Sequence, residues 1–192
     1  MHKKLVSWCA ILLLGITLNG CTSIISATTD EPIQIDPGKR SLGVKIDDQQ
    51  IETIAAVNIN KAHPMLNDAP ISVHSFNAVV LLVGQVPTKE LRELAGNTAR
   101  KLPNVRQVHN ELQVQAPISL LAGANDSWLS TKIKSKLLTN RDIDSGRLQI
   151  VTENNTVFLM GLVTHAEAEA ITDVARHTGG VQKVVRVFEY ID

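Results

Sequence analysis

The chain of 192 residues contains an internal repeat, which restricts the possible folds more than any other feature. Two apolar stretches, 79–86 and 156–163, each carry a glycine at the same place, and these glycines are 161 − 84 = 77 residues apart. Each glycine is expected to allow a close approach of two backbones or a tight bend. Downstream, after a gap of one residue, Ala99-Arg100 corresponds to Ala175-Arg176. The sequence therefore predicts two small, related folding units.

Each copy is predicted to contain a helix, two strands, a second helix and a last strand. The predicted elements are 48–61, 69–74, 78–86, 88–102 and 105–114 in the first copy, and 127–138, 147–152, 156–163, 165–177 and 181–190 in the second. At about 100° per residue, the first helices place three aliphatic side chains on one stripe. These are Ile51, Ala55 and Ile59 in the first copy and Leu129, Ile133 and Leu137 in the second. A three-stranded mixed sheet with two helices on one face would bury these rows, so the predicted class is α+β.

The N-terminus has the pattern of a bacterial lipoprotein signal. The uncharged stretch 5–18 follows Lys3 and Lys4 and is too short to span a bilayer comfortably. It ends in Leu18-Asn19-Gly20-Cys21, which resembles a lipobox, so residues 1–20 are predicted to be removed and Cys21 to be acylated. The alternative is a conventional secretory signal that happens to contain a cysteine. Acyl chains on Cys21 would anchor the protein to a membrane, with residues 21–45 as a flexible tether.

The residue after Cys21 indicates in which membrane the protein is anchored, and the overall composition excludes several classes of function. Thr22 stands where an aspartate signals retention at the inner membrane, which indicates the outer membrane, with the folded part in the periplasm. Cys9 and Cys21 are the two cysteines, so the folded part has no disulfide and no thiol nucleophile. The formal net charge is zero, which gives nucleic acid no global attraction. Neither a metal-binding histidine pair nor a nucleotide or hydrolase motif is present, so no cofactor, metal or enzymatic activity is predicted.

The first helix of the second copy has an unusual outward side. Asp126 or Ser127 is expected to cap its N-terminus. Opposite the core stripe, two large apolar groups stand among hydroxyl and lysine side chains, with no acid between them. The predicted phospholipid-binding residues on this side are Trp128, Thr131, Lys132, Lys134, Ser135 and Leu138. Lysines suit anionic headgroups, and tryptophan suits the boundary of the acyl region.

Two simpler interpretations of this helix remain. Trp128 could close the core or pack on the first copy, and the lysines could form an ordinary solvated face. The corresponding helix of the first copy has Asp47, Asp48 and Glu52 around it and no aromatic residue. An anionic bilayer would gain little from that helix, so the two copies are predicted to differ in function.

Three stretches carry a resemblance to a known family: 80–85, 125–128 and 157–164. They resemble the BON domain, a module of bacterial envelope proteins, and the resemblance extends from about Leu42 to Ile191. With the lipobox, the chain is similar to outer-membrane lipoproteins that have two BON domains, here 46–115 and 124–192. The resemblance implies an αββαβ fold for each domain.

The resemblance also implies a function. Lipid contact would fall on the first helix of the second domain, with anionic phospholipids such as phosphatidylglycerol and cardiolipin as ligands. The protein would support outer-membrane integrity and would be recruited to the division site. The alternative is a protein-interaction scaffold for outer-membrane assembly machinery, with no direct lipid contact.

Overall fold

The computed structural model describes residues 36–115, 120–139 and 143–192, apart from the side chains of residues 120–124. The predicted signal peptide, the acylation site Cys21 and the tether up to residue 35 lie outside these ranges. Within them, no helix is both long enough and apolar enough to cross a membrane.

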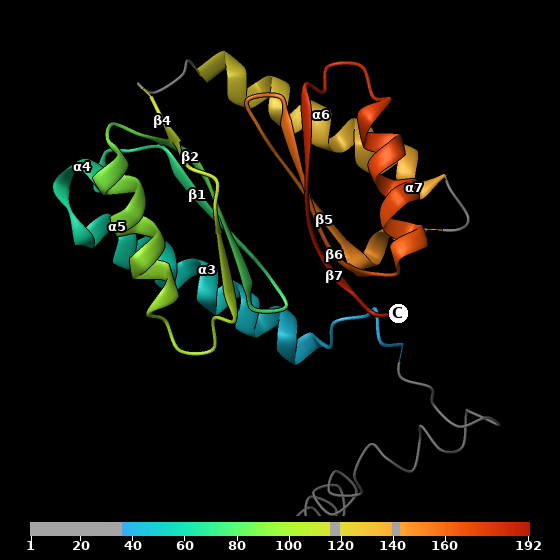
Figure 1. Ribbon diagram of the computed structural model, residues 1–192, viewed down its shortest axis with the longest axis horizontal. Helices are drawn as coiled ribbons and strands as arrows, with labels where there is room; N and C mark the ends of the chain where they lie inside the picture. The colour runs from blue at the N-terminus through green and yellow to red at the C-terminus, as the bar shows by residue number, and fades with distance from the viewer. Residues whose placement is uncertain (1–35, 116–119, 140–142) are drawn as a thin grey trace, which may run out of the picture. The chain divides into compact units, whose positions relative to one another are not determined.

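The first copy is a sheet with two helices on one face (Figure 1). Its elements are α3 (Leu42–Ala62), α4 (Pro64–Asn67), β1 (Ile71–Phe76), β2 (Val79–Val86), α5 (Lys89–Arg100), β3 (Gln107–Asn110) and β4 (Gln113–Val114). The central strand β2 pairs antiparallel with β1 and parallel with β3 and β4. The helix begins at Leu42 rather than at residue 48, because the Ser41 hydroxyl accepts a hydrogen bond from the Val44 N–H and caps it there. Residues 42–45, predicted to belong to the tether, are therefore helical.

The second copy repeats this arrangement (Figure 1). It consists of α6 (Leu120–Leu138), β5 (Leu148–Glu153), β6 (Thr156–Val163), α7 (His165–Arg176) and β7 (Lys183–Tyr190), with a short 3-10 turn at Ser145–Arg147. Strand β6 is central, antiparallel to β5 and parallel to β7. The predicted α+β class, with a mixed sheet and two helices in each copy, is confirmed.

In both copies a buried aspartate ties the first helix to the hairpin turn of its own sheet. Each turn has two residues with positive φ, Asn77 and Ala78 in the first copy and Asn154 and Asn155 in the second. Asp48, which is 3% exposed, accepts hydrogen bonds from both backbone N–H groups of its turn, at 2.9 and 2.8 Å. Asp126, which is 7% exposed, accepts the equivalent pair at 2.7 and 2.9 Å. We call this contact the carboxylate–turn lock.

The lock corrects two predictions. Asp126 does not cap α6, because the helix already begins at Leu120 and the carboxylate is occupied by the turn. Asp48, which the sequence places among the charges around the outside of the first helix, is instead buried against the Ser75 hydroxyl at 2.8 Å and the Arg40 guanidinium.

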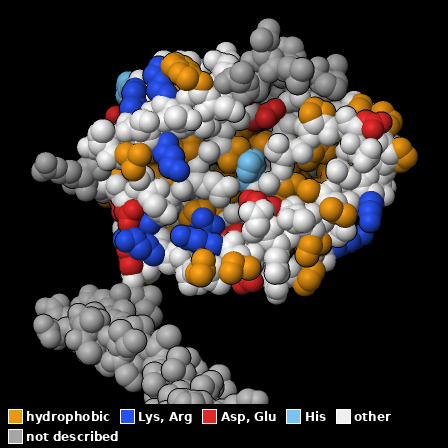
Figure 2. All heavy atoms as spheres, turned by 180° about the vertical axis from the view of Figure 1, so that it is seen from behind, with side chains coloured by type: hydrophobic (Ala, Val, Ile, Leu, Met, Phe, Trp, Pro, Cys, Tyr) orange, Lys and Arg blue, Asp and Glu red, His pale blue; other side chains and the backbone are white. Residues whose placement is uncertain are grey.

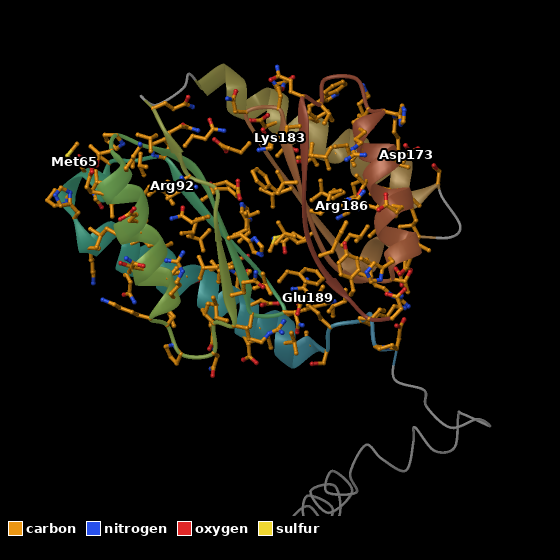
Figure 3. The ribbon with its side chains drawn as sticks, viewed as in Figure 1. Met65, Arg92, Asp173, Lys183, Arg186 and Glu189 are labelled. Carbon is orange, nitrogen blue, oxygen red and sulfur yellow. The ribbon has the colours of Figure 1, made fainter. Side chains whose placement is uncertain are left out.

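The sheet faces that the helices leave free pack against each other. Side chains of β2 alternate, so Val80 and Leu82 lie under the helices, whereas Leu81 joins Phe158 and Met160 of β6 in a third buried cluster. At the margin, the Asn77 side-chain amide donates to Glu189 at 2.9 Å, and Glu189 is labelled on β7 in Figure 3. The prediction of one covered face was therefore incomplete. Burial on both faces explains why the central strands are almost continuously apolar.

The repeated glycines permit close backbone contacts, as predicted. Gly84 has φ +120°, and a Cβ there would lie 2.0 Å from the Pro70 carbonyl oxygen. A Cβ on Gly161 would lie 2.9 Å from the Arg147 carbonyl oxygen. Each central strand can therefore approach the chain just before its partner strand only where no side chain intervenes.

Replacing Asp48 tests the lock. Asp48→Asn should lower the free energy of unfolding by about 2–4 kcal/mol, because the amide nitrogen cannot accept from the turn and Arg40 loses its charged partner. The exposed neighbour provides the control, and Asp47→Asn should change stability by no more than about 0.5 kcal/mol. Urea unfolding followed by circular dichroism measures both. Equal effects of the two substitutions would contradict the lock.

The same carboxylate makes stability depend on pH. Burial alone would raise the pKa of Asp48, but hydrogen bonds from Ala78, Ser75, Asn77 and Arg40 outweigh it and hold the pKa below its ordinary value. A lowered folded-state pKa contributes stability above about pH 4, which is lost as the pH falls through the folded value. The stability difference between the wild-type chain and Asp48→Asn should thus be full at pH 7 and shrink below about pH 4. Urea titrations across this range measure it, and a constant difference would be the contrary result.

Candidate functional site

The rotation of α6 about its axis is fixed by contacts on its inner side. Leu129, Ile133 and Leu137 are each 0% exposed, as the stripe predicted. Beside them, Asp126 holds the hairpin turn, and the Ser130 hydroxyl donates to the Thr152 hydroxyl at 2.7 Å. The opposite side of the helix must therefore face outward.

The outward side carries the six residues predicted from the sequence. Trp128 is 57% exposed and Leu138 is 64% exposed, which excludes a place for the indole in the core. Of the remaining four, three are exposed and Lys132 is half-buried. At about 100° per residue, the order across this side is Lys134, Leu138, Thr131, Ser135, Trp128 and Lys132. The apolar and hydroxyl groups thus lie between two lysines, and we call these six residues the α6 face.

The hydroxyl groups of the α6 face are satisfied within the helix. Thr131 donates to the Ser127 carbonyl oxygen at 3.0 Å, and Ser135 donates to the Thr131 carbonyl oxygen at 3.0 Å. Because these hydroxyls already have partners, an apolar environment would cost them little.

The lysines of α6 differ in what they contact, which the sequence did not reveal. Lys132 Nζ donates to the Gly179 carbonyl oxygen at 3.2 Å and lies 4.5 Å from the centre of the Trp128 ring. Lys136 Nζ is 3.5 Å from the His177 carbonyl oxygen. Lys134 is exposed on the other flank. Within the described ranges, none of these lysines lies within ion-pair distance of a carboxylate, so their charge is not neutralised locally.

A shallow hollow of about 220 Å³ adjoins the α6 face, between α6 and β5. It is lined by Ser130, Thr131, Lys134, Ser145, Leu148, Gln149 and Ile150. The lining combines three hydroxyl groups, one amide and one cation with two aliphatic side chains. On the face seen in Figure 2, Lys and Arg side chains lie beside hydrophobic ones at the upper left, on the side of the second copy.

The corresponding positions of the first copy have different chemistry. At a spacing of 129 − 51 = 78 residues, Gln50 replaces Trp128, Ile54 replaces Lys132 and Asn60 replaces Leu138. The first copy therefore has the same helix and the same lock but no aromatic, cationic face. Among the residues that the structure describes, no group of three His, Cys, Asp or Glu side chains is placed to hold a metal ion.

Comparison with known proteins identifies the repeat. The BON domain matches residues 47–116 and 125–192. The chain is 33% identical over 183 residues to outer membrane lipoprotein DolP of Haemophilus influenzae, covering 94% of this chain and 95% of that protein. It is 38% identical over 162 residues to the 21 kDa hemolysin of Actinobacillus pleuropneumoniae, with 84% and 82% covered. Osmotically-inducible protein Y of Escherichia coli is 27% identical over 185 residues, with 90% and 91% covered.

The exposure of Trp128 can be tested by stability alone. Trp128→Gln should change the free energy of unfolding by no more than about 1 kcal/mol, because it removes an exposed ring and one cation–π contact. Leu129→Ala, at the next residue, should cost about 2–5 kcal/mol, because it leaves a cavity in the core. Chemical denaturation measures both variants. A loss at Trp128 as large as that at Leu129 would place the indole inside.

Proposed function

Because the chain belongs to the BON-domain family of outer-membrane lipoproteins, we propose that it binds anionic phospholipid through the α6 face. The observation that carries the proposal is the exposure of Trp128 and Leu138 between lysines that have no carboxylate partner among the residues that the structure describes. The role is that of a binding protein and not of an enzyme.

The arrangement of the α6 face suits the boundary between headgroups and acyl chains. Trp128 and Leu138 would enter the boundary, where an indole keeps its ring in apolar surroundings and its N–H near water. The satisfied hydroxyls between them would enter at little cost. Lys132 and Lys134, on the two flanks, would reach headgroup phosphates on either side of the helix.

The hollow beside Lys134 gives the headgroup a place to lie. With the α6 face on a bilayer, the hollow would open toward the lipid alongside Lys134. Its volume of about 220 Å³ and its hydroxyl groups favour a small polar headgroup.

The free-energy contributions of the side chains indicate how strongly the α6 face would bind lipid. Each lysine near an anionic surface contributes about 1 kcal/mol. Partial burial of Trp128 and Leu138 adds about 3 kcal/mol. For Lys132, Lys134 and the two apolar side chains together, a gross gain of about 5 kcal/mol must offset the cost of orienting and ordering the domain, so the isolated domain should bind weakly.

The membrane anchor changes the consequence of weak binding. We place the anchor at Cys21, with the folded part in the periplasm. An anchored domain meets lipid at a high effective concentration, so the α6 face need not bring the protein to a membrane. It would instead select the anionic patches that the protein occupies. Such selection would support outer-membrane integrity and recruitment to the division site.

A lipid titration tests the proposal. Adding phosphatidylglycerol micelles to the chain without residues 1–21 should shift backbone NMR signals of residues 127–138, and phosphatidylcholine micelles should not. Trp128→Glu should reduce the apparent affinity at least tenfold, because it removes the apolar anchor and adds a negative charge. Gln50→Glu makes the matched change at the equivalent position of the first copy and should leave the titration unchanged.

Two results would contradict lipid binding through the α6 face. One is equal loss of affinity in both variants, which would mean a general charge effect. The other is an absence of shifts together with retained binding to an outer-membrane assembly protein, which would favour the scaffold function.

A further inference from the structure

The outward side of α3 exposes four aliphatic side chains in a row. Leu42 is 75% exposed, Ile46 51%, Ile54 48% and Val57 44%. At about 100° per residue they lie within one third of the helix circumference, together with Gln50 and opposite Ile51 and Ala55 of the core. We call Leu42, Ile46, Gln50, Ile54 and Val57 the α3 ridge. The face in Figure 2 shows several exposed hydrophobic side chains along its lower part.

The α3 ridge is electrically neutral, which favours a protein partner over an anionic bilayer. Two of the three acids of α3 are engaged inward, since Asp48 holds the hairpin turn and Glu52 accepts from the Ser75 N–H at 2.8 Å. The third, Asp47, is exposed at the edge of the ridge, where it would repel an anionic bilayer. Where α6 carries Lys132, α3 carries Ile54. Depletion of charge around exposed aliphatic groups is typical of the centre of a protein–protein interface.

The spacing of the ridge is nearly symmetric about Gln50. Ile46 stands four residues before it and Ile54 four residues after it, and Leu42 and Val57 lie eight before and seven after. A two-fold axis requires that if residue i of one copy contacts residue j of the other, j also contacts i. An antiparallel pair of α3 helices crossing at Gln50 meets this condition, with Ile46 against Ile54 on both sides.

We propose that the α3 ridge packs antiparallel against the α3 ridge of a second copy of this chain. Residues four apart form the ridges that interdigitate in the commonest class of helix packing. At the crossing, the Gln50 amide offers both a donor and an acceptor, so two copies of it can hydrogen-bond to each other across the axis. This contact does not depend on lipid binding by the α6 face.

The size of the ridge determines where pairing occurs. A standard interface buries about 800 Å² on each partner, which is more than one helix ridge of four aliphatic side chains provides. Copies dissolved at low concentration should therefore remain mostly single. Copies anchored in one membrane meet at a high effective concentration, so pairing is expected there.

Disulfide cross-linking in membranes tests the pairing. The full-length, membrane-anchored chain with Gln50→Cys, treated with a mild oxidant, should form a covalent dimer. Lys45→Cys is the matched control, since Lys45 is also exposed on α3 but points away from the ridge. The Gln50→Cys yield should be at least five times higher, and adding Ile54→Lys should return it to the control level. Ile54 is half-exposed, so circular dichroism should show this variant folded, and Leu42→Lys is a second disrupting variant.

A second cross-linking experiment tests whether the two α3 helices pack antiparallel. Differently tagged Ile46→Cys and Ile54→Cys chains in one membrane should cross-link to each other more than either does to itself, as an antiparallel pair requires. Equal yields for Gln50→Cys and Lys45→Cys would overturn the proposal. So would preferential like-with-like cross-links, or a product that contains one copy and a different envelope protein.

Discussion

The structure depends on one repeated interaction, a carboxylate within a helix that accepts both backbone N–H groups of a tight hairpin turn. The turn's N–H groups point away from the strand ladder and need acceptors, and Asp48 and Asp126 supply them at distances of 2.7–2.9 Å. This contact fixes the rotation of the first helix over its sheet. It therefore decides which helix positions are buried and which face outward. Trp128, two residues after Asp126, is exposed for this reason.

Because the two sheets pack against each other, the candidate binding surfaces lie on the outward sides of the helices. Phe76, Leu81, Phe158 and Met160 are buried in a cluster shared by the two copies, so this part of the sheet faces is not available to ligands. What remains exposed on each first helix is the side opposite its core stripe. The two copies differ in composition on this side, because α6 presents tryptophan and lysines where α3 presents aliphatic and amide groups. One scaffold thus offers a face suited to anionic lipid and a neutral ridge suited to a protein surface.

The sequence predicted the features that depend on local pattern. The bounds of β6, Thr156–Val163, followed from an apolar run between the Asn155 turn and a helix that Thr164 caps. The exposure of the α6 face followed from the core stripe. The lock was not predicted, because Asp126 and its turn are 28 residues apart and an aspartate near a helix start resembles a cap. The lysine contacts with the Gly179 and His177 carbonyls also depend on the fold. Burial of the second sheet face was not predicted, although continuous apolar runs such as those of β2 and β6 are typical of strands that are buried on both faces.

Tryptophan fluorescence tests the central account most directly. The sequence has two tryptophans, and Trp8 lies in the predicted signal peptide, so Trp128 alone reports in a chain without residues 1–21. Vesicles of phosphatidylglycerol with brominated acyl chains should shift its emission to shorter wavelength and quench it, and brominated phosphatidylcholine vesicles should do neither. The same response to both lipids, or no response to phosphatidylglycerol while the chain stays folded, would contradict binding of anionic lipid through the α6 face.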